Sequence, residues 1–87
     1  MLKPVNLIVF DSTDLYNTLL KEFSNNVEKA EVAFDYIANE SDEMLASFYL
    51  PVPEEQQYYD EIAGEIADII VKNSNGVQYG DTVYILF

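Results

Sequence analysis

The sequence predicts an α+β fold of the ferredoxin-like, split βαβ type, with two helices on one face of an antiparallel sheet. Runs rich in β-branched and aromatic residues predict strands, and longer segments with apolar residues at helical spacing predict helices. Their order is strand, helix, strand, strand, helix, strand. At 87 residues and 9.9 kDa, the chain has room for one modest core. We therefore expect residues 1–87 to form a single domain.

The first predicted strand covers residues 5–10, a β-branched run that follows Pro4. Residues 11–14, Asp-Ser-Thr-Asp, then supply N-cap side chains and early negative charge for a helix. Residues 24–26, Ser-Asn-Asn, are expected to end it. The apolar residues at helical spacing are Leu15, Tyr16, Leu19, Leu20, Phe23 and Val27.

The segment around residues 31–37 is compatible with either a strand or a helix. Val32, Phe34 and Tyr36 alternate as in a strand, and we favour that interpretation. The alternative is a helix opened by Asn25 with Glu28 three residues later. That helix would place Val27, Ala30, Phe34 and Ile37 on one face.

The second half of the chain predicts a hairpin, a helix and a final strand. Residues 39–43 form the expected hairpin loop, and residues 44–50 form its returning strand. The helix begins at Pro53 or Glu54 and ends within residues 73–76, while residues 82–87 form the last strand. Gly64 weakens this helix unless a close contact compensates. The expected apolar stripe comprises Tyr59, Ile62, Ala63, Ile66, Ile69 and Ile70.

The charge of the chain is strongly negative and unevenly distributed. Sixteen acids stand against four Lys, which gives a net charge of −12. Residues 1–29 hold three Lys and four acids, and residues 72–87 hold one of each. The remaining eleven acids lie in residues 30–71, which contain no base: Glu31, Asp35, Glu40, Asp42, Glu43, Glu54, Glu55, Asp60, Glu61, Glu65 and Asp68.

The composition argues against several classes of function. The absence of Cys excludes disulfide frameworks and thiol chemistry, and the absence of His removes the side chain that titrates near neutral pH. The acidic surface repels nucleic acids and anionic membranes, since binding to either needs Lys or Arg. We therefore expect neither partner, and we expect no cofactor, no metal site and no enzymatic activity. The expected location is the cytoplasm, or the host cytoplasm if the protein is viral.

One short motif resembles an enzyme family. Residues 7–11, an apolar run that ends in Asp11, resemble the opening motif of haloacid-dehalogenase-type phosphatases. That resemblance implies a nucleophilic Asp. The second acid is Asp14, three residues later, whereas the family places it two residues later. A strand followed by a helix N-cap accounts for the same residues.

The predicted second helix supplies the candidate binding face. Glu54, Glu61, Glu65, Asp68 and Lys72 follow spacings of seven, four, three and four, which places them on one exposed stripe. The hairpin tip is expected to extend this row, and Tyr58 adds an amphipathic aromatic group. The full set of candidate partner-binding residues is Glu40, Asp42, Glu43, Glu54, Glu55, Tyr58, Asp60, Glu61, Glu65 and Asp68.

These features predict a small acidic inhibitor that occupies the nucleic-acid-binding surface of a positively charged protein, such as a nuclease. In size and charge the chain is similar to the inhibitors that phages and mobile elements direct against CRISPR nucleases, restriction enzymes or host DNA-binding proteins. One alternative is an immunity protein for a basic nuclease toxin. Another is a non-catalytic ferredoxin-like structural or regulatory subunit, with a homodimer formed through the open sheet face.

The clustered charge predicts a salt-dependent stability. Repulsion among eleven acids weakens as ions screen it, and the Debye length falls to about 8 Å at 0.15 M salt. We expect the melting temperature to rise between very low salt and about 0.15 M salt. Thermal unfolding followed by circular dichroism measures this change. A flat or falling curve would contradict a dense acidic face.

Overall fold

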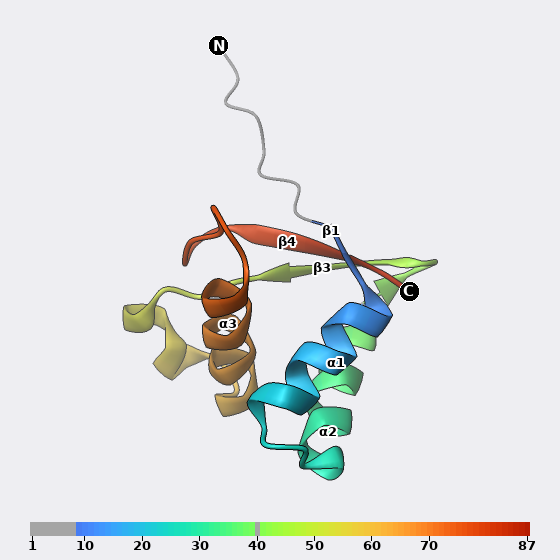
Figure 1. The fold of residues 1–87 in the computed structure, drawn as a ribbon. Coiled ribbons are helices and arrows are strands. Elements are labelled where there is room, and N and C mark those ends of the chain that lie inside the picture. Colours follow the sequence, from blue (N-terminus) through green and yellow to red (C-terminus); the bar gives the residue numbers. More distant parts are fainter. Residues whose placement is uncertain (1–8, 40) are drawn as a thin grey trace.

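The computed structural model describes residues 9–39 and 41–87, and it shows an α+β fold in which helices lie against one face of a four-stranded sheet (Figure 1). The order of the strands in the sheet is β1-β4-β3-β2. The strands are β1 (Val9–Asp11), β2 (Ser41–Asp42), β3 (Leu45–Tyr49) and β4 (Thr82–Leu86). The helices are α1 (Ser12–Glu22), α2 (Val27–Ala38), the 3-10 helix η1 (Pro53–Tyr58) and α3 (Glu61–Asn73).

The expected strand at residues 32–37 is wrong, because this segment belongs to helix α2. The side chain of Asn26 accepts a hydrogen bond from the Lys29 backbone N–H at 3.1 Å and caps the helix, one residue after the cap that the helical alternative proposed. Ala30, Ala33 and Ile37 are fully buried at helical spacing. The alternation that suggested a strand is coincidental, since Val32 is 59% exposed.

The sheet order also corrects the ferredoxin-like prediction. β4 lies inside the sheet, where it pairs in parallel with β1 and antiparallel with β3. The sheet is therefore mixed, whereas the sequence predicted an antiparallel one. With α2 in place of a strand, β1 and β3 are separated in sequence by two helices and by the two-residue edge strand β2. The α+β class is confirmed, and the split βαβ order is not observed.

The strand predicted at residues 44–50 is present as β3, but the hairpin differs from the prediction. It joins β2 to β3, so the expected loop at residues 39–43 contains a strand, and the turn follows it with Glu43 at a positive φ of 61°. β4 and the end of the predicted first strand are present, whereas residues 5–8 lie outside the described residues. The predicted second helix divides into η1 and α3, because Tyr59 and Asp60 adopt extended backbone angles between them.

The close contact expected at Gly64 is present. A Cβ atom at this position would lie 3.1 Å from the Oε1 atom of Gln56 on η1. The Gln56 side chain also donates a hydrogen bond to the carbonyl of Pro51 at 3.3 Å. The missing side chain at Gly64 therefore allows η1 to fold back onto α3, and this arrangement offsets the low helix propensity of glycine.

The core lies between the sheet and the helices. β4 contributes Val83 and Ile85, α1 contributes Leu15 and Leu19, and α3 contributes Ile66, and each of these is at most 1% exposed. The opposite face of the sheet carries the exposed cross-strand pair of Leu45 and Leu86. Tyr59, which the sequence placed in the apolar stripe, is 43% exposed because it lies before α3 begins. Across residues 9–39 and 41–87, no helix has the length and apolar character of a membrane span.

The cap of α2 is testable by mutation. Asn26→Ala removes the acceptor for the Lys29 N–H, so we expect a loss of about 1 kcal/mol in the free energy of unfolding. Asn26→Ser keeps a capping oxygen and should retain most of the stability. Urea unfolding of both variants measures the effect. Equal stability of the wild type and Asn26→Ala would contradict the cap.

Candidate functional site

The acids of the predicted site occupy two separate regions of the molecule. Asp42 and Glu43 lie at the β2–β3 turn, whereas the other described acids lie on η1, on α3 or, in the case of Asp60, between these two elements. Strand β3 separates the regions, and its five residues span about 16 Å at the usual rise per residue. Figure 1 shows the hairpin and η1 at opposite ends of β3. The hairpin tip therefore does not extend the helical row. Glu40 lies outside the described residues.

The single stripe expected along the second helix is also divided. Glu54 belongs to η1, while Glu61, Glu65 and Asp68 belong to α3. Because Tyr59 and Asp60 are extended, the spacing of seven residues does not place Glu54 and Glu61 on one helical face. On α3 itself the spacings of four and three place the three acids on neighbouring turns.

Two of the acids on α3 are engaged by other parts of the chain. The ammonium group of Lys29 on α2 lies 2.8 Å from the Glu65 carboxylate and 4.8 Å from the centre of the Phe23 ring. The Tyr79 hydroxyl donates a hydrogen bond of 2.7 Å to Asp68. This hydrogen bond, with smaller contributions from burial and from the charge of Asp68, raises the pKa of Tyr79 above its ordinary value.

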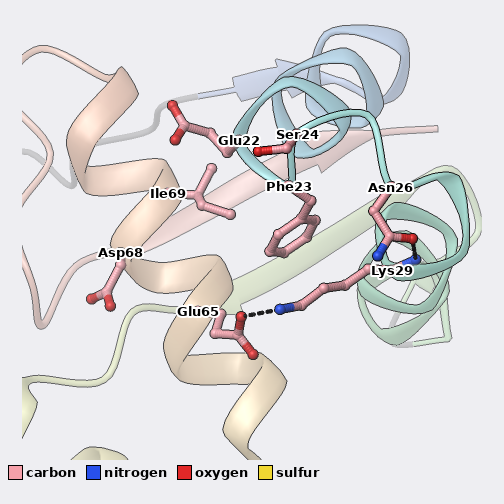
Figure 2. A pocket seen from close by; sticks show the side chains of 8 residues that line it. All are labelled: Glu22, Phe23, Ser24, Asn26, Lys29, Glu65, Asp68 and Ile69. Atoms are coloured by element: carbon pink, nitrogen blue, oxygen red, sulfur yellow. Dashed lines mark hydrogen bonds and ion pairs between the residues drawn. The ribbon is translucent and has the colours of Figure 1, made fainter.

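Figure 2 shows the pocket between α3 and the α1–α2 turn, where the Lys29 side chain reaches across to Glu65. The pocket has a volume of about 430 Å³. Glu65 is neutralised by Lys29, and Glu22 on the opposite wall is paired with Lys72 at 3.1 Å. Internal ion pairs therefore cancel much of the negative charge in this pocket. Its lining comprises Glu22, Phe23, Ser24, Asn26, Lys29, Glu65, Asp68 and Ile69.

Glu55 has a structural contact that the sequence did not reveal. Its carboxylate accepts a hydrogen bond of 2.7 Å from the Tyr49 hydroxyl and one of 3.3 Å from the Val52 N–H. The hydrogen bond that Glu55 accepts stabilises the neutral form of Tyr49 and raises its pKa, and burial and the charge of Glu55 add to this effect. Glu55 thus joins η1 to the end of β3 and is not free to bind a partner.

Five of the predicted acids have unpartnered carboxylates among the residues that the structure describes: Asp42 and Glu43 at the β2–β3 turn, and Glu54, Asp60 and Glu61 between η1 and the start of α3. Within the described part of the chain, the side chains of Glu54, Asp60 and Glu61 form no hydrogen bond or ion pair, and all three are exposed. Tyr58 lies at the end of η1 and is 79% exposed. We call these four residues the η1–α3 acidic face. Next to it is a hollow of about 340 Å³, lined by Gln56, Gln57, Asp60, Glu61, Gly64, Glu65 and Asp68.

A further acidic stripe lies on α2, and the sequence analysis missed it. Glu28, Glu31 and Asp35 follow spacings of three and four and are exposed. The signal was present in the sequence, but it is visible only if residues 27–38 form a helix. As a strand, this segment would have placed Glu31 and Asp35 at isolated positions.

The described residues contain no cluster of three or more Asp, Glu, His or Cys side chains that could hold a metal ion. Comparisons with protein-family models, with curated proteins and with solved structures find no match for this chain. The argument for function therefore rests on the geometry and charge of the described residues.

The two hydrogen bonds that the Glu22 carboxylate accepts predict how this group titrates. The Glu22 carboxylate accepts a hydrogen bond of 3.0 Å from the Asn73 amide and one of 3.1 Å from the Lys72 ammonium. Both bonds lower the pKa of Glu22. Since the folded pKa is lowered, the contribution of Glu22 to stability is present above its unfolded pKa and is lost as the pH falls through its folded pKa.

We expect Asn73→Ala and Lys72→Met each to raise the pKa of Glu22, as measured by carboxyl chemical shifts during an acid titration. Lys29→Met removes a lysine that pairs with Glu65 instead, so it serves as the control. A Glu22 pKa that is the same in all four proteins would contradict the assigned contacts.

Proposed function

We propose that this protein is a non-catalytic inhibitor that binds the basic, nucleic-acid-binding surface of a partner protein. The observation that carries this proposal is the η1–α3 acidic face, in which three unpartnered carboxylates and the exposed Tyr58 lie within residues 54–61. These carboxylates would face Lys and Arg side chains that otherwise contact phosphates.

The proposed mechanism is electrostatic and steric. A net charge of −12 attracts a basic surface over distances of about a Debye length and so raises the association rate. After encounter, the Tyr58 ring supplies an amphipathic contact of the kind found at the centres of interfaces. The bound protein then excludes nucleic acid from the surface that it covers.

The spacing of acids on α3 supports partial mimicry of a phosphate backbone. Residues four apart on a helix are separated by about 6 Å along its axis, which is comparable to the few ångströms between phosphates along a strand. Glu61 and Glu65 have this spacing. The pairing of Glu65 with Lys29 weakens the negative potential there, so Glu54, Asp60 and Glu61 contribute most to the proposed contact.

The proposal is tested with the full chain as bait. A binding protein is captured from an extract of the organism that encodes this chain, and its affinity is then measured by biolayer interferometry. Glu54→Gln/Glu61→Gln removes two charges from the η1–α3 acidic face, whereas Asp42→Asn/Glu43→Gln removes two exposed charges from the β2–β3 turn, at the other end of β3. We expect the first variant to weaken binding roughly tenfold and the second to weaken it about twofold.

Competition with nucleic acid is the decisive arm of this experiment. Duplex DNA or single-stranded RNA that the captured protein binds should displace the wild-type chain. Simultaneous binding of the chain and the nucleic acid would contradict the proposal, as would equal loss of affinity in the two variants.

A further inference from the structure

A groove between α1 and α2 lies outside every residue assigned above to partner binding. It has a volume of about 450 Å³ and lies where the first turns of α1 approach the second half of α2. The pocket of Figure 2 lies at the other end of this helix pair, beside the α1–α2 turn. The groove is lined by Ser12, Thr13, Tyr16, Glu31, Phe34 and Asp35, and we call it the α1–α2 groove.

Aromatic rings form the apolar part of the α1–α2 groove. The half-buried rings of Tyr16 and Phe34 meet edge to face, with centroids 5.7 Å apart and planes at 87°. Phe34 also contacts the ring of Phe87, with centroids 5.4 Å apart. Phe34 therefore packs against two neighbouring rings in the edge-to-face arrangement that aromatic pairs prefer.

Two carboxylates form the rim. Glu31 and Asp35 are exposed and lie one helical turn apart, which places them about 6 Å from each other along the axis of α2. Neither side chain forms a hydrogen bond or an ion pair with any residue that the structure describes.

No described lysine neutralises this rim. Lys29 pairs with Glu65, and Lys72 pairs with Glu22. Lys21 belongs to the last turn of α1 and lies five residues beyond Tyr16, the groove residue nearest to it on that helix, or about 7.5 Å along the axis. It forms no ion pair with Glu31 or Asp35. Lys3 lies outside the described residues. The negative charge of the rim is therefore available to a ligand.

Aromatic faces beside free carboxylates are complementary to a cationic side chain. Arginine fits this combination better than lysine, because its planar guanidinium stacks on rings and donates several hydrogen bonds to carboxylates at once. We propose that the α1–α2 groove receives an arginine side chain from a basic segment of the partner protein, with its guanidinium between Glu31 and Asp35 and against Phe34. The class of partner rests on the proposed function, whereas the groove adds a second contact on different helices.

The test uses an acetylated, amidated hexa-arginine peptide as the probe and a hexa-lysine peptide for comparison, at low salt. NMR titration of the wild-type chain should shift the aromatic resonances of Tyr16 and Phe34, and the shifts should saturate at a lower concentration of hexa-arginine than of hexa-lysine. Glu31→Gln/Asp35→Asn should weaken binding at these rings roughly five- to thirtyfold. The matched control Glu54→Gln/Glu61→Gln removes the same charge elsewhere and should weaken it about twofold at most.

The possible results separate the groove from the proposed function. Shifts confined to η1 and α3 would overturn the α1–α2 groove and leave the proposed function standing. Equal saturation by the two peptides at Tyr16 and Phe34 would overturn the preference for arginine, and equal weakening by the two double variants would overturn the assigned rim. If hexa-arginine shifted no resonance of the chain, both proposals would fail.

Discussion

Strand β4 is the element on which the arrangement of the molecule depends. It pairs with β1 on one side and with β3 on the other, so it joins the beginning, middle and end of the described chain in one sheet. Its alternating side chains place Val83 and Ile85 in the core, facing the helices, and leave Leu86 on the open face. Helices α1, α2 and α3 pack on the same face of the sheet (Figure 1). Their exposed positions include charged residues such as Glu31, Asp35 and Glu61.

The same arrangement determines where the acids can act together. β3 leaves the sheet toward η1 at the end opposite its hairpin, which separates the acids of the turn from those of α3. Lys72 on α3 pairs with Glu22 on α1, and Lys29 on α2 pairs with Glu65 on α3, so these ion pairs neutralise part of the surface around α3. Among the described residues, the unpartnered carboxylates are found at the beginning of α1, on the exposed face of α2, at the β2–β3 turn, on η1 and at the beginning of α3. The chain thus presents more than one negative surface.

Patterns within single elements could be predicted from the sequence, whereas relations between elements could not. The apolar spacing identified Leu15 and Leu19 of α1 and Ile66 of α3 as core residues, and all three are buried. The strand prediction for the α2 segment failed because Val32, Phe34 and Tyr36 alternate as in a strand although Val32 is exposed on the helix, and the deciding cap bond of Asn26 involves a side chain whose role depends on the fold. The order of the strands depends on long-range pairing, which local periodicity does not report.

The same distinction between patterns within one element and contacts between elements applies to the candidate site. Its exposed members at residues 54, 58, 60 and 61 could be found from the clustering of acids and tyrosines. The bond from Tyr49 to Glu55, the Lys29–Glu65 pair and the Tyr79–Asp68 bond could not be found, since each joins residues on different elements. These contacts convert three of the predicted binding residues into partly structural ones, and they concentrate the proposed interaction on the carboxylates that remain free.

The central claim is that a partner is attracted by charge, and the ionic-strength dependence of the association rate tests it most directly. Stopped-flow mixing of the chain with its captured partner, between about 0.05 and 0.5 M salt, measures the association and dissociation rate constants separately. The account predicts that the association rate constant falls steeply with added salt while the dissociation rate constant changes little. An association rate constant that is independent of salt would contradict it.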